Sequence, residues 1–211
     1  MSDITFERDG RSTRAEATRD RRRRELLDVA LRVFSERGYH ETRISDLIAA
    51  AGVARGTFYL YFESKNAIFH ELLDELVARI NGSIVGVELG EGAPSLRDQL
   101  IATLERVFAV FDASPDLTAF VLRVAVGLDP EIDKKLSELY GRLHAFIAMS
   151  LDNGVQLGLV RATDARIVAW AVLGSIKQLV EVLVERRERD LHAMVESLVD
   201  YNLAGLLASA R

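Results

Sequence analysis

Apolar residues recur along most of the chain at the three- and four-residue spacing of an α-helix. From about residue 18 to 37, Leu27, Ala30 and Phe34 share one face, while Asp28 and Arg32 fall on the other. Similar patterns predict helices over about 65–81, 95–112, 115–127, 131–159, 164–188 and 190–208. The sequence shows no convincing alternating strand pattern and no internal repeat, so it predicts an all-α fold.

The predicted helix ends coincide with residues that stop or cap helices. Gly38 ends the first helix, and residues 89–94 form a glycine-proline loop. Ser114 and Asp129 each precede a proline, which is the pattern of an N-cap followed by proline at the first helical position. Thr163 or Asp164 can cap the next helix.

Two short helical patterns lie between residues 38 and 65, separated by Gly52. We expect Thr42 to cap the first of them, and Leu47 to lie on its apolar face. Glycine adopts the left-handed conformation of a sharp turn at little cost, and Val53 anchors the turn in the core. A helix, a glycine turn and a second helix form the helix-turn-helix arrangement, which binds DNA.

The second helix, over about 54–62, carries chemistry that suits DNA. Phe58 and Phe62 point inward, which leaves its polar residues for solvent or a ligand. Arg55 offers the planar fork that matches the O6 and N7 acceptors of guanine, and hydroxyl and lysine groups suit phosphate oxygens. The alternative is that the tyrosines are simply part of the edge of the hydrophobic core. The predicted DNA contacts are Thr42, Arg43, Arg55, Gly56, Thr57, Tyr59, Leu60, Tyr61 and Lys65.

Charge is divided unevenly along the chain. The net charge is −5, but residues 1–66 hold 13 Lys and Arg against 11 Asp and Glu. Arg19 and residues 21–24 form an arginine cluster, which can neutralise phosphates, or can simply be a solvated helix face or disordered tail. We expect residues 1–17 to be a flexible basic arm.

The segment from about Arg24 to Glu71 contains the motifs Ala50-Ala51-Gly52-Val53, Gly56-Thr57-Phe58-Tyr59, Tyr61-Phe62 and Ser64-Lys65. By these motifs it resembles the DNA-binding domain of the TetR family of transcriptional regulators. The resemblance implies an N-terminal domain that reads DNA and a divergent C-terminal domain that binds a small effector and dimerises through its last two helices. Two residues depart from the family pattern, because Ile48 replaces a small alanine and Ala54 replaces a capping serine or threonine.

The predicted domains are therefore 18–66 for DNA binding and 67–211 for effector binding and dimerisation. Residues 167–184 are apolar around most of the helix, and one subunit's core can cover only part of that surface. The last two helices of two subunits would form a four-helix interface with two-fold symmetry. The alternative is a fully buried helix pair inside a monomer.

The effector site is only weakly indicated by the sequence. Aromatic and polar residues on the C-terminal helices could line a cavity, although each such residue is more often part of a core. The family resemblance suggests a hydrophobic or amphipathic small molecule. The candidate ligand-binding residues are Phe108, Phe111, Phe120, Tyr140, His144, Trp170 and Gln178.

The sequence predicts no catalytic residue, metal ligand set or cofactor. His70-Glu71 begins like a zinc-binding HExxH motif, but Asp74 replaces the second histidine. The chain has no cysteine, and the apolar run of residues 167–176 is shorter than the roughly 20 residues of a membrane helix. We expect a cytoplasmic protein with no membrane partner.

These features favour a homodimeric transcriptional repressor that a small-molecule effector releases from a palindromic double-stranded DNA operator. Effector binding would tilt the helix that begins near Lys65 and change the separation of the recognition helices. Two alternatives stay open at this point: a helical small-molecule binding protein that does not read specific DNA, and a transcriptional activator.

Overall fold

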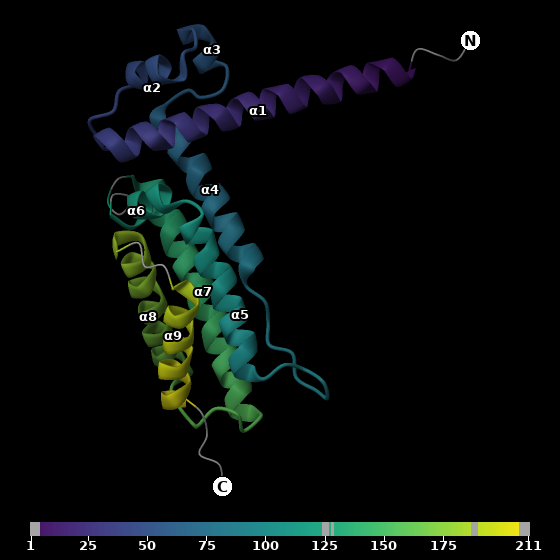
Figure 1. Ribbon diagram of the computed structural model, residues 1–211, viewed down its shortest axis with the longest axis vertical. Coiled ribbons are helices and arrows are strands. Elements are labelled where there is room, and N and C mark those ends of the chain that lie inside the picture. The colour runs from purple at the N-terminus through teal and green to yellow at the C-terminus, as the bar shows by residue number, and fades with distance from the viewer. Residues whose placement is uncertain (1–4, 124–126, 128, 187–189, 207–211) are drawn as a thin grey trace. The chain divides into compact units, whose positions relative to one another are not determined.

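The computed structural model describes residues 5–123, 127, 129–186 and 190–206 (Figure 1). The all-α prediction is confirmed. The helices in these ranges are α1 (Thr5–Arg37), α2 (Ile44–Ala51), α3 (Arg55–Tyr59), α4 (Lys65–Ser83), α5 (Leu96–Asp112), α6 (Pro115–Arg123), α7 (Pro130–Gln156), α8 (Ala165–Arg186) and α9 (Leu191–Leu206).

The chain divides into two compact units, residues 1–73 and 74–211, so the division falls inside α4. We expected the boundary near residue 66, where that helix begins. The first turns of α4 belong to the first unit because Phe69 lies against Tyr39, with ring centroids 6.0 Å apart, and Glu71 pairs with Arg23 of α1. Helix α4 therefore contributes to both units.

The first unit is built on the apolar stripe of α1. Leu27, Ala30 and Phe34 are almost fully buried, as are Phe58 of α3 and Phe62 just beyond it. Figure 1 shows α2 and α3 beside the C-terminal half of α1. This is the arrangement that the spacing of apolar residues predicts.

Helix α1 is longer than expected, because it begins at Thr5 rather than near residue 18. Residues 5–17 are therefore helical and not a structureless arm. The reason lies in local propensity: this stretch has no proline and is rich in arginine, glutamate and alanine, all good helix formers. Its single glycine, Gly10, does not interrupt the helix.

The second unit is a bundle in which α7 packs on α8, and α5 packs on α9. One core cluster joins Phe108 of α5 to Val180 of α8 and Val195 of α9. A smaller cluster joins Leu151 of α7 to Ala169 of α8. Both clusters use the apolar stripes that the sequence shows.

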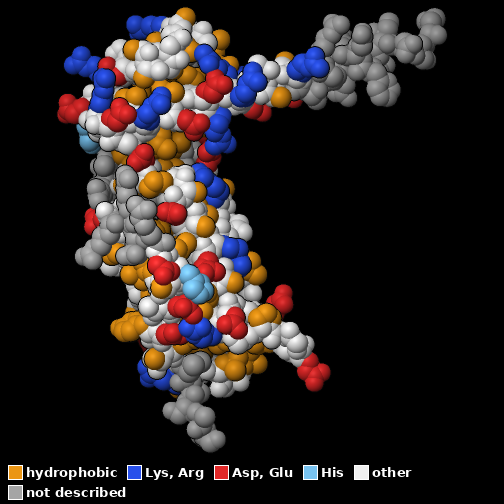
Figure 2. Space-filling view, viewed as in Figure 1, with side chains coloured by type: hydrophobic (Ala, Val, Ile, Leu, Met, Phe, Trp, Pro, Cys, Tyr) orange, Lys and Arg blue, Asp and Glu red, His pale blue; other side chains and the backbone are white. Residues whose placement is uncertain are grey.

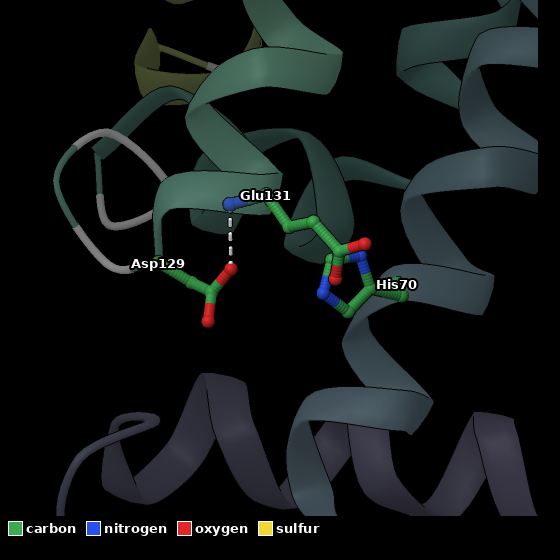
Figure 3. Close-up of side chains that lie close together, drawn as sticks. All are labelled: His70, Asp129 and Glu131. Atoms are coloured by element: carbon green, nitrogen blue, oxygen red, sulfur yellow. Dashed lines mark hydrogen bonds between the residues drawn. The ribbon is translucent and has the colours of Figure 1, made fainter.

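The expected caps of two helices in this bundle are present. The Asp129 carboxylate accepts a hydrogen bond from the Glu131 backbone N–H at 2.8 Å, and Pro130 is the first residue of α7 (Figure 3, which also draws His70 of α4). Asp164, not Thr163, caps α8, because its carboxylate accepts from the N–H of Arg166 at 3.1 Å. The expected ends at residues 188 and 208 lie outside the described residues.

Helix α7 ends at Gln156, three residues earlier than predicted. Gly158 takes a positive φ of 71°, which reverses the chain. Val160 then packs on Gly154 so closely that a Cβ at Gly154 would lie 2.6 Å from Val160 Cγ2. The apolar sequence pattern continues through this turn, so periodicity alone does not reveal it.

Helix α8 is more apolar over its full length than the ten-residue run suggested. Among the described residues, the stretch Ala165–Glu185 is the one helix that could cross a membrane by length and composition alone, with a mean hydropathy of 1.8. Only 22% of its most apolar window is buried within the chain. Much apolar surface on α8 is therefore not covered by the described part of the chain.

Candidate DNA-binding site

The turn between α2 and α3 has the geometry of a helix-turn-helix. Gly52 follows α2 with φ 63° and ψ 32°, in the left-handed region that glycine adopts without strain. Its N–H donates to the Ala49 carbonyl at 3.2 Å, which closes the end of α2. As the sequence suggests, Ala54 precedes α3 without forming a side-chain capping bond.

Helix α3 turns one face to the core and the other to solvent. Phe58 is 1% exposed, whereas Leu60, directly after the helix, is 72% exposed and Tyr59 is 41% exposed. Arg55 and Gly56 are also exposed, and the Arg55 guanidinium lies 5.7 Å from the centroid of the Tyr59 ring. A cation, an aromatic ring and an apolar side chain are thus presented together on α3 and the residue that follows it.

A groove of about 540 Å³ lies beside this face, between α2 and α3. Ile48, the departure from the family pattern, is half-buried in its wall rather than hidden in the helix crossing. Sequence reasoning did not predict the groove, which depends on the angle between the two helices. Its lining residues are Ile44, Ser45, Ile48, Ala49, Gly52, Val53, Arg55 and Tyr59.

Thr42 does not have the role we predicted for it. The N-cap of α2 is Arg43, whose N–H donates to the Asp46 carboxylate at 2.8 Å. Thr42 is 1% exposed, and its hydroxyl donates to the Gly38 carbonyl at 2.7 Å. Because this hydroxyl is turned inward, we do not retain Thr42 among the proposed DNA contacts, whereas Arg43 is exposed and is retained.

The Lys65 side chain also forms its hydrogen bonds within the first unit. Its ammonium group donates to the carbonyls of Tyr39, His40 and Thr42 at 2.7, 3.3 and 3.1 Å. It also lies 4.4 Å from the centroid of the Tyr39 ring. An ammonium has three donors, so Lys65 has none left for phosphate and instead fixes the α1–α2 connection to the start of α4.

The arginine cluster on α1 is not uniform. Arg23 points its guanidinium at Glu71 of α4, with Nε 2.6 Å from Oε1, and Nη1 donates to the Tyr61 carbonyl at 3.0 Å. The hydrogen bond to Glu71 raises the pKa of Arg23. Arg22 instead pairs with Glu25 on its own helix at 2.6 Å. On the face drawn in Figure 2, Lys and Arg side chains of the first unit stand among acidic ones.

The remaining predicted contacts are only partly accessible. Thr57 and Tyr61 are half-buried, and the Tyr61 carbonyl already accepts from Arg23. Seven of the nine predicted residues are therefore exposed or half-buried: Arg43, Arg55, Gly56, Thr57, Tyr59, Leu60 and Tyr61.

The predicted ligand-binding residues do not surround one cavity. Phe108 and Phe120 are buried, and Phe111 packs against the same core as Phe108. Tyr140 is half-buried, and burial, with the negative charge of Glu181 as a second cause, raises its pKa.

The polar candidates lie at the surface of α7 and α8. The His144 ring stacks on Trp170 with centroids 4.3 Å apart, and His144 Nε2 lies 2.8 Å from the Arg166 carbonyl. Gln178 is exposed and donates to Glu181 at 3.1 Å. A hollow of about 240 Å³ between α6 and α8 contains none of the predicted residues, and is lined by Ala119, Leu122, Glu181, Val184 and Glu185.

A helix-turn-helix with an outward polar face, joined to a separate helical bundle, defines the class of DNA-binding transcriptional regulators. Residues 26–72 match the family described as bacterial regulatory proteins, tetR family. The helix-turn-helix segment of this chain therefore belongs to the TetR family. Its members are transcription factors rather than enzymes, and Glu71 of the partial HExxH motif is engaged with Arg23.

The likeness extends beyond the matched domain. The uncharacterized HTH-type transcriptional regulator YdgC of Bacillus subtilis is 28% identical over 88% of this chain and 92% of its own length. A TetR-family regulator from Syntrophomonas wolfei is 28% identical with a TM-score of 0.68, covering 91% of this chain and all of that one. FadR from Bacillus subtilis, solved with stearoyl-CoA, is 24% identical with a TM-score of 0.65, covering 86% and 97%.

Proposed function

We propose that this regulator is a dimeric repressor whose α3 helices read a palindromic operator and which a small-molecule effector releases. The observation that carries the proposal is the division of α3 between a buried Phe58 and an exposed face with Arg55, Tyr59 and Leu60. Two such helices, related by two-fold symmetry, would enter successive major grooves about one DNA turn apart.

Each exposed side chain suits a different part of the duplex. Arg55 would bind guanine O6 and N7, and Leu60 would contact a thymine methyl group. Arg43 and the hydroxyls of Tyr59 and Tyr61 would bind phosphate and set the register. Gly56 would allow the backbone to approach the groove.

Dimerisation through α8 and α9 is supported by the apolar surface that one chain leaves uncovered. Ile167 and Trp170 of α8 are 69% and 53% exposed, and Tyr201 of α9 is 76% exposed. The Asn202 side chain of α9 lies 3.4 Å from the Ser175 hydroxyl of α8, so the two helices lie side by side. A second copy would remove this surface from water, which also accounts for the apolar character of α8 in a cytoplasmic protein.

The effector is proposed to be a hydrophobic or amphipathic molecule. The stearoyl-CoA bound to FadR makes acyl-CoA thioesters reasonable first compounds to test. Because α4 contributes to both units, a ligand that shifts α4 would change the spacing of the recognition helices. A ligand that binds more tightly to the conformation in which the recognition helices do not match the operator would shift the protein population off the operator.

The proposal is tested by footprinting the purified protein on the DNA that flanks its own gene, at physiological salt. We expect protection of a palindromic site by wild-type protein and loss of that protection in Arg55→Ala with the helical circular dichroism spectrum retained. Equal binding of wild-type protein to all duplexes would contradict it.

A further inference from the structure

Arg23, a member of the arginine cluster, connects three segments of the first unit. Its fork binds both oxygens of Glu71 on α4, and its Nη1 donates to the carbonyl of Tyr61, two residues after α3 ends. The guanidinium carbon lies 4.6 Å from the centroid of the buried Phe62 ring. A planar fork that is bidentate to a carboxylate and stacked on a ring has a fixed orientation.

The ion pair is partly shielded from water. The Arg23 and Glu71 side chains are 37% and 26% exposed, in contrast to 41% and 48% for the neighbouring Arg22–Glu25 pair on α1. Arg22–Glu25 joins two residues of one helix, whereas Arg23–Glu71 joins residues 48 positions apart. The second pair can therefore hold separate elements in place, which the first cannot.

Lys65 makes a second connection of the same kind. It joins the first residue of α4 to the carbonyls that lead into α2. The helix-turn-helix is thus attached to α4 at two points, one on the α2 side and one on the α3 side. A change in the direction of α4 would be passed to α3 instead of being absorbed in residues 60–64.

We propose that Arg23 is a positioning residue, which with Glu71 holds the end of the recognition segment on α4, and is not a phosphate contact. The inference rests on the proposed function, because it assigns how α4 controls the α3 helices. The opposing interpretation follows from the sequence alone, in which Arg23 belongs to a basic cluster that neutralises phosphate.

The two interpretations predict different changes in DNA affinity when the charge of Glu71 is removed. If Arg23 binds phosphate, removing the nearby negative charge of Glu71 leaves DNA affinity unchanged or raises it. If the pair positions α3, removing either partner weakens binding to the same extent, and removing both adds little. Lysine can replace arginine as a phosphate-binding charge but cannot reproduce the bidentate fork.

The experiment measures the affinity of R23Q, E71Q, R23K and the R23Q/E71Q double variant for a duplex that wild-type protein selects from a random-sequence pool. Affinity is measured at several salt concentrations and at a temperature where circular dichroism shows every variant folded. R22Q and E25Q are the matched controls, since they break an ion pair that stays within α1.

We expect R23Q, E71Q and R23K each to bind roughly tenfold more weakly, as for loss of a charge-assisted hydrogen bond. The double variant should be no weaker than either single one, and E25Q should bind like wild type. The inference is overturned if E71Q and R23K bind like wild type while R23Q loses about 0.9 from its salt slope. If wild-type protein selects no sequence from the pool, the proposed function itself is contradicted. This inference is then overturned too, because α3 has no duplex on which to be positioned.

Discussion

At the scale of single residues, Gly52 sets the angle between the two helices that present the recognition face. Its φ of 63° is strained for any residue with a Cβ, but an added Cβ would meet no atom within 4 Å. Gly52→Ala should therefore destabilise the protein through backbone strain alone, by about 1–2 kcal/mol. Thermal unfolding followed by circular dichroism measures this, and an unchanged melting temperature would show that the turn tolerates a side chain.

Gly56 offers a matched comparison on the next helix. It has no positive φ, and a Cβ there would also meet no atom within 4 Å. Gly56→Ala should leave the melting temperature unchanged or raise it, because alanine is the better helix former by roughly 1 kcal/mol. The added methyl group would keep the backbone from the major groove, so operator affinity should fall. Unchanged affinity would remove Gly56 from the proposed interface.

At the scale of helices, charged side chains connect α9 to α5 across the surface of the second unit. His192 Nδ1 lies 2.6 Å from Glu105 of α5, and His192 Nε2 lies 3.6 Å from Glu196. Arg97 of α5 binds Glu196 and Asp200 in turn. The hydrogen bond to Glu105, followed by the charge of Glu196, raises the pKa of His192 above its ordinary value of 6.5, and Asp190 adds to this.

This raised pKa predicts a pH-dependent contribution to stability. The folded state binds the proton more tightly, so the stabilisation is complete below pH 6.5 and is lost as the pH rises through the folded pKa. The melting temperature of wild type should exceed that of His192→Asn near pH 6, and the two should converge near pH 8.5. A constant difference across this range would contradict a protonated His192. The effect should be small and salt-sensitive, because the group is exposed.

The helices themselves were largely predictable from the sequence, and the connections between them were not. Periodicity placed Phe58 and Phe62 in the core, and turn chemistry identified Gly52 and Asp129, because these signals are local. The sequence shows the charges of Arg23 and Lys65, but not their partners 48 and 26 residues away. The helical pattern does not show which aromatic candidates for the effector site are buried, and the bundle distributes them between core and surface.

At the scale of the whole molecule, the exposed apolar face of α8 and α9 predicts a dimer. Trp170→Glu should convert the dimer to a monomer, because it would place a charge in the proposed interface. Leu89→Glu is a control, since Leu89 is similarly exposed, at 59% against 53%, but lies in the loop before α5. Light scattering gives the mass, and a wild-type monomer at micromolar concentration would contradict the paired-helix mechanism.

The central claim is that α3 reads a specific DNA sequence. The most direct test is the ratio of wild-type affinities for the duplex it selects and for a scrambled duplex, both near 0.15 M salt. We predict a ratio of about 10³ or more. In Arg55→Ala, the free-energy difference between the two duplexes should fall by about 1–3 kcal/mol, because one bidentate contact is lost. A ratio near one for the wild-type protein would contradict the account.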